Sequence, residues 1–394
     1  MTGTVVEFGL YLHLPYCRSL CPYCAFAKAP LHRAEPERLL AALAREWELA
    51  RREAPAAWGR ARPRTIYFGG GTPTALDPPT LRRLLAWLHA AFDLSGVREW
   101  TVEANPEGLS AEKLGLLRSA GVDRLSLGVQ SLEPAALRAL GRIHTAEGAL
   151  EALALARSSG FRSVSVDLMT AVPGETAAGF RTGVETMVAL GVPHLSVYSL
   201  QVEEGTPLHA KVARGGIETP GEEIAAERYE TLAGIASRAG YRHYEVSNFA
   251  LPGHESRHNQ GYWARRPYLA LGPGGHSFDG RRRWGNEENV TGYFESLEEG
   301  SLPRRDVTDV APDDVVSELV MLGLRRSRGL RLGALARLAP RAVAEWERWA
   351  VAAGALAPGP PGRARPSERG LLTVHELAAE LLSRIEAERR GRAA

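Results

Sequence analysis

The sequence predicts an α/β protein that ends in a small, mostly helical domain. From residue 5 to about residue 205, short apolar runs alternate with amphipathic segments rich in Ala, Leu and Arg. This alternation is typical of βα units that form a parallel sheet. Beyond residue 309, apolar residues recur at helical spacing around a Pro- and Gly-rich stretch. A length of 394 residues suits two or three domains.

Six apolar runs are the predicted strands. Six strands are too few for a closed eight-stranded barrel, and they suit a partial barrel or an open sheet. In both architectures ligands bind at the carboxyl ends of the strands. The intervening segments, such as 36–53 and 78–92, have the apolar stripes of helices that pack on a sheet. The strand runs are 8–14, 64–70, 98–104, 123–129, 162–172 and 193–200.

The rest of the chain is less regular. A helix is expected over 220–240, followed by segments rich in aromatic residues, His and Gly, and 306–315 reads as a linker. The stretch 357–368 is either the wing of a winged-helix-like unit or a flexible loop. We therefore expect three parts: a barrel-like domain at 1–205, an irregular α/β extension at 206–308, and a helical domain at 309–394.

Composition excludes some functional classes. The formal net charge is +2, so whole-chain electrostatics indicate neither nucleic acid nor membrane as a partner. No run of about twenty apolar residues is present. The first fifteen residues have no basic segment before their apolar part and read as a strand rather than a signal peptide. We expect a cytoplasmic protein.

All three cysteines of the chain, Cys17, Cys21 and Cys24, lie within eight positions directly after the first strand. They are too close together for a disulfide framework, and they indicate a reducing compartment. Their spacing favours an iron–sulfur cluster, in which three thiolates leave one iron open for a small chelating molecule. Zinc, with His13 or His32 as a fourth ligand, is the alternative.

The segment "CRSLCPYC" after the first strand resembles the cysteine loop of the radical S-adenosylmethionine (SAM) superfamily. In "YFGGGTPT", glycines 69–71 permit close approach to backbone N–H groups, and this stretch matches the family's motif for the SAM amino group. The resemblance implies a partial (βα)6 barrel with a [4Fe–4S] cluster whose open iron binds SAM. It also implies that reduction of the cluster cleaves SAM to a 5′-deoxyadenosyl radical. The implied SAM contacts are Gly70, Gly71, Thr72, Glu103, Gln130, Arg142 and Asp167.

Within the superfamily, the chain resembles the branch of oxygen-independent coproporphyrinogen III oxidases (HemN) and the related heme chaperones (HemW). By this resemblance Tyr11 stacks near the cluster or SAM, and Tyr23 lies against SAM. Phe26 stands where the oxidases have a further cysteine. The motif "HNQGYW" at 258–263 is typical of the chaperones.

The resemblance assigns heme contacts to this motif, and imidazole is a good axial ligand for heme iron. His254 and His276 are alternative candidates to His258 for this ligand. The assigned heme residues are His258, Asn259, Gln260, Tyr262 and Trp263.

These observations give three candidate functions. The leading one is a HemW-like chaperone that binds heme and passes it to acceptor hemoproteins. The second is a radical SAM oxidase acting on a porphyrinogen, and the third is a structural zinc protein with a winged-helix module. For the chaperone we expect an electron donor such as flavodoxin or ferredoxin where SAM is cleaved, peripheral membrane contact only through acceptors, a monomer or dimer, and no nucleic acid.

Overall fold

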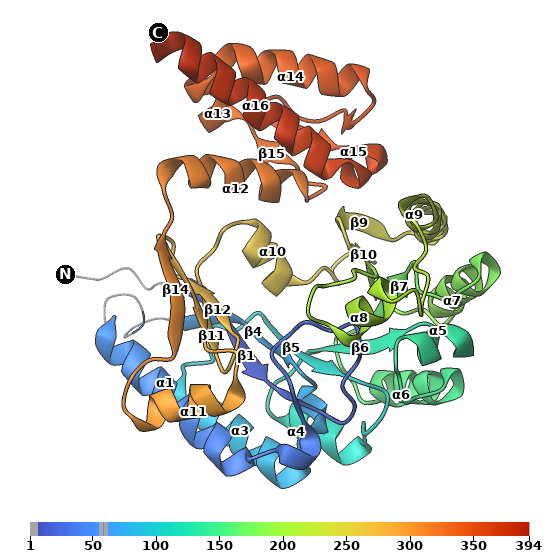
Figure 1. Cartoon of the computed structure of the whole chain (residues 1–394), viewed down its shortest axis with the longest axis vertical. Coiled ribbons are helices and arrows are strands. Elements are labelled where there is room, and N and C mark those ends of the chain that lie inside the picture. Colours follow the sequence, from blue (N-terminus) through green and yellow to red (C-terminus); the bar gives the residue numbers. More distant parts are fainter. Residues whose placement is uncertain (1–6, 55–57, 59–61, 394) are drawn as a thin grey trace.

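A computed structural model describes residues 7–54, 58 and 62–393 (Figure 1). Its largest element is a mixed sheet, which has twelve strands within those residues. The six predicted strands lie in the sheet in chain order, each parallel to the next. This order confirms the α/β class and the partial barrel. The strands are β1 (Glu7–Leu14), β4 (Arg62–Gly70), β5 (Glu99–Ala104), β6 (Arg124–Gln130), β7 (Ser163–Thr170) and β8 (His194–Ser199).

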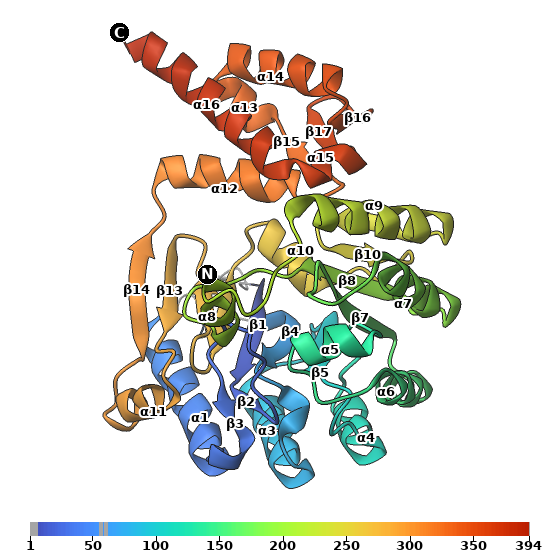
Figure 2. The same ribbon diagram turned by 45° about the vertical axis from the view of Figure 1, so that its right-hand side comes forward.

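Amphipathic helices cover the outer face of the curved sheet (Figures 1 and 2). Their apolar stripes join one buried core with the strands, as Leu39, Leu43 and Trp47 of α1 do. Four of these helices begin at a side chain that accepts the N–H three residues later, as cap residues do. The helices are α1 (Pro36–Glu53), α3 (Pro78–Ala91), α4 (Ala111–Ser119), α5 (Pro134–Ala139), α6 (Ala146–Ser158) and α7 (Ala177–Ala189).

The less regular segment extends the same sheet at both edges. A strand that the sequence did not predict, β11 (Tyr268–Leu271), pairs in parallel with β1. Its four residues are too few to show a period. Antiparallel strands complete the edges: β9 (Arg242–Glu245), β10 (Asn248–Ala250), β12 (His276–Phe278), β13 (Arg282–Asn286) and β14 (Arg304–Asp309). The helices of this segment are α8 (Pro207–Ala213), α9 (Glu222–Arg238), α10 (Arg257–Trp263) and α11 (Val290–Glu298).

Short elements bracket the cysteine loop. Strand β2 (Tyr16–Cys17) pairs in parallel with β3 (Ala29–Pro30), so the loop leaves and rejoins the barrel at one place. The 3-10 turn η1 (Leu31–Arg33) follows β3, and η2 (Pro73–Ala75) follows β4.

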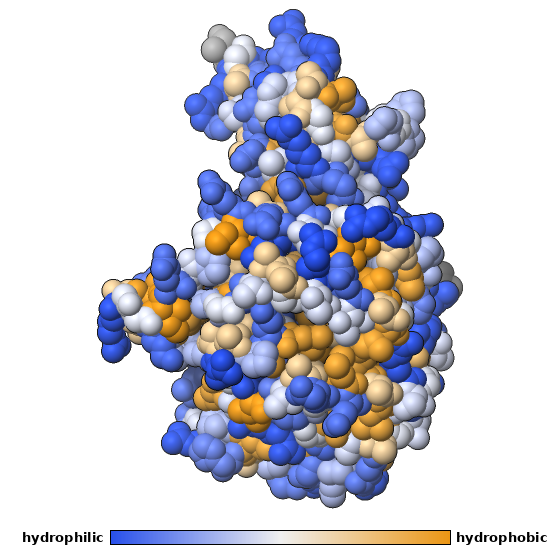
Figure 3. All heavy atoms as spheres, turned by 90° about the vertical axis from the view of Figure 1, so that its right-hand side faces the viewer, coloured by the Kyte–Doolittle hydropathy of each residue, from blue (hydrophilic) through white to orange (hydrophobic). Residues whose placement is uncertain are grey.

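The C-terminal elements have their own core, and Figure 3 shows them as a narrower lobe above the larger one. The predicted linker is instead strand β14 up to Asp309, and a helix begins at Pro312. Trp346 is fully buried in this core, and its indole N–H donates to the Leu377 carbonyl oxygen at 3.0 Å. The helices are α12 (Pro312–Leu324), α13 (Gly333–Leu338), α14 (Pro340–Ala352), α15 (Glu368–Leu372) and α16 (Val374–Ala393). A small antiparallel sheet comprises β15 (Leu330–Arg331), β16 (Leu356–Ala357) and β17 (Arg363–Pro366).

Helix α10 is anchored to the start of β5 by a buried carboxylate. Glu99 is 1% exposed and accepts the backbone N–H groups of Arg257 and His258, each at 2.9 Å. It also accepts the Ser256 hydroxyl at 3.4 Å, and Ser256 caps the helix. A negative charge at the positive end of a helix is favourable, particularly where water is excluded. The chain segment with the HNQGYW motif is thereby held at the N-terminal end of the barrel strands.

In the described part of the chain, every helix is too short or too polar to cross a membrane.

We predict that Glu99→Ala releases α10. Three donors lose a charged acceptor, and hydrogen bonds to charged groups contribute about 1.5–3 kcal/mol each. Amide hydrogen exchange of residues 257–263 should therefore accelerate by roughly a hundredfold. Glu298→Ala is the control, because its ion pair with Arg38 is exposed. Unchanged exchange in Glu99→Ala would contradict this anchoring role.

Candidate functional site

The three cysteines line one cavity of about 530 Å³ at the carboxyl ends of the parallel strands. Each is a free, half-buried thiol. Their side chains are not gathered around one point as the ligands of a single metal ion would be. Among the described residues, no other group of three or more His, Cys, Asp or Glu is gathered around one point in this way. In an iron–sulfur cluster each thiolate binds its own iron, so the ligands can lie farther apart.

Hydrogen-bond donors point at two of the three cysteine sulfurs. The Thr72 hydroxyl lies 3.6 Å from Cys17 Sγ, and Arg142 Nη1 donates to Cys21 Sγ at 3.4 Å. Burial raises the pKa of the Cys17 thiol to about 11 in the metal-free chain. Donors of this kind orient cluster ligands and tune their charge. The residues present therefore fit a cluster with three thiolate ligands.

Arg142 links the cysteine loop to two neighbouring strands. Its Nη2 donates to the Asn105 side-chain oxygen at 2.7 Å and to the Gly128 carbonyl oxygen at 2.9 Å. Burial alone would lower the pKa of Arg142, but the nearby Cys21 and Glu107 raise this pKa above its usual value. Its buried Nε has no partner among the described residues. This N–H is therefore a buried donor that the surrounding residues leave unsatisfied.

The glycines at the end of β4 permit close packing of the chain. An added Cβ would lie 2.6 Å from the His13 ring at Gly70, where φ is +103°, and 2.6 Å from Pro15 at Gly71. The Gly71 N–H donates to the Leu14 carbonyl oxygen at 2.9 Å. The contact of these two glycines with SAM stays a prediction. Both glycines still line the cavity, as does Thr72.

Two half-buried carboxyl groups, those of Glu103 and Asp167, line the cavity. Glu103 accepts the Tyr67 hydroxyl at 2.7 Å, and Asp167 accepts the Ser126 hydroxyl at 3.0 Å. Burial raises the pKa of Glu103 to about 7 and that of Asp167 to about 6. Such groups ionise readily when a cation or a hydroxyl donor approaches.

The other predicted SAM residues separate into two groups. Gln130 and Tyr23 line the cavity. Gln130 is held at φ +68° beside a bulge in β6, a strained conformation for a residue other than glycine. Tyr11 instead lies behind Tyr67, with ring centroids 6.0 Å apart, and bonds to the His13 ring at 3.3 Å. The cavity wall at this point is Tyr67.

Sequence reasoning missed several cavity residues. Tyr67 lies in the middle of an apolar strand run, and Lys28 and Tyr198 follow no recognisable motif. Asn105 could have been found, because it comes directly after the strand that ends at Ala104 and strand ends were the predicted ligand positions.

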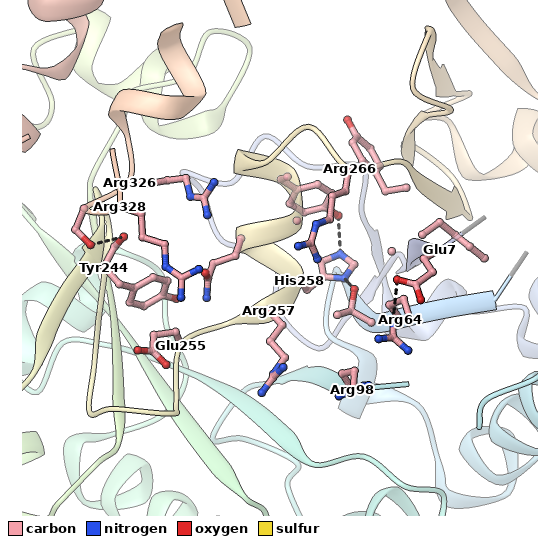
Figure 4. A pocket seen from close by; sticks show the side chains of 18 of the residues that line it. Glu7, Arg64, Arg98, Tyr244, Glu255, Arg257, His258, Arg266, Arg326 and Arg328 are labelled. Atoms are coloured by element: carbon pink, nitrogen blue, oxygen red, sulfur yellow. Dashed lines mark hydrogen bonds and ion pairs between the residues drawn. The ribbon is translucent and has the colours of Figure 1, made fainter. Parts of the chain in front are cut away.

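The HNQGYW motif forms α10 and divides two cavities. Asn259 lines the cysteine cavity. His258, Gln260 and Tyr262 line a second cavity of about 1100 Å³, here called the arginine cavity (Figure 4). Trp263 instead packs under Arg325, 4.9 Å from its ring, with its indole N–H unpartnered in the described structure. The motif therefore does not form one continuous surface.

His258 is buried between two hydroxyl groups. Its Nδ1 lies 2.8 Å from the Thr65 hydroxyl and its Nε2 2.8 Å from the Tyr262 hydroxyl. Burial lowers the pKa of His258 to about 3, so the ring is neutral. Of the rival histidines, His254 bonds to the Ser163 hydroxyl at 3.2 Å and His276 is exposed.

Comparison with known proteins places this geometry in a family. The Radical SAM superfamily profile matches residues 11–187. The "Heme chaperone HemW" of Mycobacterium tuberculosis is 39% identical over 85% of this chain and 87% of its own length. That of Bacillus subtilis is 36% identical over 81% and 84%. The structure of Escherichia coli coproporphyrinogen III oxidase (HemN) matches 96% of this chain and 90% of its own, with TM-score 0.81 and 21% identity, which shows a shared fold.

We predict that Arg142→Gln weakens cluster retention. The variant loses a charged donor to Cys21, and a loss of 1.4 kcal/mol or more corresponds to at least about a tenfold change in affinity. Iron and sulfide per chain after anaerobic reconstitution and desalting should fall, with an unchanged circular dichroism spectrum. Arg138→Gln, an exposed neighbour on α5, is the control. Equal iron content in both variants would rule out this role.

Proposed function

The chain belongs to the HemW heme chaperone family within the radical SAM superfamily, and we propose that it binds heme and passes it to acceptor hemoproteins. The observation that supports this best is α10, whose HNQGYW motif contributes side chains to both cavities. A chaperone that also binds SAM needs a heme site and a cofactor site that can communicate. One short helix between the two cavities meets that need.

Family membership implies a [4Fe–4S] cluster and SAM as cofactors, and we propose Cys17, Cys21 and Cys24 as the cluster ligands. When bound, such a cluster supplies an electron and an open iron site. Arg142 then holds Cys21, and Glu103 offers a carboxyl group to the ribose hydroxyls or ammonium of SAM.

The oxidase reaction is not favoured. Phe26 stands where the oxidases have a further cysteine, and it is 70% exposed at the edge of the cysteine cavity. Leu20 and Ile143 are also exposed, at 44% and 57%. Exposed apolar side chains beside a cofactor site suit contact with another protein. We propose this rim as the contact surface for an electron donor such as flavodoxin or ferredoxin, or for an acceptor.

We propose His258 as the axial ligand of heme iron. A neutral imidazole can donate a lone pair to iron without first losing a proton. Ligation through Nε2 requires the hydrogen bond between Nε2 and the Tyr262 hydroxyl to break. The hydrogen bond between the Thr65 hydroxyl and Nδ1 keeps the ring oriented. This exchange couples heme binding to a movement within α10.

SAM binding should strengthen as the pH rises from 6.5 to 8. Below its pKa of about 7 the Glu103 carboxyl is protonated, and an ammonium or hydroxyl donor binds better to the carboxylate. The dissociation constant measured by anaerobic calorimetry should fall by roughly fourfold over this range, because the ionised fraction of a single group with this pKa rises by about that factor. Glu103→Gln should remove the slope, and Glu112→Gln, which is exposed, should retain it. A slope that persists in Glu103→Gln would exclude Glu103.

Hemin added to the anaerobically purified protein should shift the Soret band, with no vinyl product formed from coproporphyrinogen III. His258→Ala should alter the Soret position and weaken hemin binding by about tenfold, since an iron ligand is lost. His254→Ala serves as the control. Turnover of coproporphyrinogen III would contradict the chaperone function, and an unchanged spectrum in His258→Ala would refute ligation by that residue.

A further inference from the structure

The arginine cavity lies at the opposite end of the barrel from the cysteines. It is lined by the first residues of β1 and β4, by α10, and by the chain between α12 and β15. Figure 4 shows α10 crossing its centre, with Arg326 and Arg328 on one side and Arg64 and Arg98 on another. Its volume of about 1100 Å³ exceeds that of most small-ligand pockets, so it can accept a large cofactor.

The cavity wall is strongly cationic. Among the described lining residues nine are arginines and two, Glu7 and Glu255, are acidic. Of these nine, Arg64 alone has a carboxylate within 4.0 Å in the described structure, that of Glu7 at 3.2 Å. Elsewhere arginines commonly pair with carboxylates, as Arg265 does with Glu318. The uncompensated charge in the cavity therefore points to an anionic ligand with several acceptor oxygens.

Three of these arginines converge from different elements. Arg266 follows α10, whereas Arg326 and Arg328 precede β15 in the C-terminal lobe. Burial lowers the pKa of Arg326, and the neighbouring Arg328 and Arg266 lower it further. Like charges at this proximity repel one another until an anion lies between them. Such an anion would bridge the two lobes.

The same wall offers flat apolar surfaces. Tyr262 and Tyr268 are half-buried at the cavity, and Pro267 and Pro360 lie beside it. The rings of the two tyrosines are 4.7 Å apart in an edge-to-face arrangement. At Gly261, on the same helix, an added Cβ would meet no atom within 4 Å, so the helix surface faces open space there. Aromatic faces beside paired cations fit a planar apolar ring that bears carboxylates.

We propose that the arginine cavity is the heme site, with the two propionates held by Arg266, Arg326 and Arg328 and the macrocycle lying against α10. This inference rests on the proposed function, because it names the place where the chaperone holds its heme. A nucleic acid is the less favoured ligand, since the arginines converge from opposite walls of a hollow rather than spread over an outward face. Propionate binding would draw the C-terminal lobe toward α10 and so link heme occupancy to the arrangement of the two lobes.

The test compares hemin with hemin dimethyl ester, which lacks free carboxylates. Cluster-loaded wild-type protein should bind hemin at least tenfold more tightly than the ester. The double variant Arg266→Glu, Arg326→Glu should bind hemin at least tenfold more weakly and lose the preference. The double variant Arg238→Glu, Arg341→Glu is the matched control, because it makes the same charge change at exposed positions outside the cavity.

A second variant guards against misfolding of the first. Gly261→Trp adds bulk into open space, so it should abolish hemin binding while iron, sulfide and SAM binding stay at wild-type values. If wild-type protein fails to bind hemin, the proposed function itself falls, and this inference with it. If it binds hemin and all variants match it, only the inference falls. Binding of a short duplex DNA that the double variant loses, with hemin binding unchanged, would also overturn it.

Discussion

The attachment of α10 to Glu99 organises the rest of the molecule. A fully buried carboxylate is costly unless it is hydrogen-bonded, and here the N-terminus of α10 supplies the donors. Because Glu99 begins β5, the helix is fixed to the barrel at the end opposite the cysteines. One buried charge therefore positions a single helix that contributes Asn259 to the cysteine cavity and several side chains to the arginine cavity.

The two cavities differ in chemistry, and this difference separates their roles. The cysteine cavity combines three thiols with two half-buried carboxyl groups. Partial burial raises the pKa values of these carboxyl groups, which suit a cationic, hydroxyl-bearing ligand such as SAM. The arginine cavity has the opposite charge and suits a dicarboxylate. His258 and both of its hydrogen-bond partners, Thr65 and Tyr262, line the arginine cavity. The next residue of α10, Asn259, lines the cysteine cavity, so adjacent residues of one helix face the two cavities.

The sequence predicted which residues gather at the strand ends better than it predicted how distant segments pack together. The cysteine spacing and the polar residues at strand ends identified the cysteine cavity, because βα order alone brings successive strand ends together. The sequence could not show that Tyr67 rather than Tyr11 lines the cysteine cavity, because this depends on how the two rings pack between neighbouring strands. Nor could the sequence show the arginine cavity, because Arg64, Arg266 and Arg328 are far apart in the chain. They line one cavity only because the segment between α12 and β15 lies over this end of the barrel.

Iron-edge anomalous diffraction from crystals of the cluster-loaded protein with hemin would test the two-site account most directly. The account predicts two separate iron centres about 20 Å apart, on opposite sides of α10. This distance follows from the rise of about 3.3 Å per residue along β1, which joins the two cavities. A heme iron beside the cluster, inside the cavity lined by Glu103 and Asp167, would contradict the account.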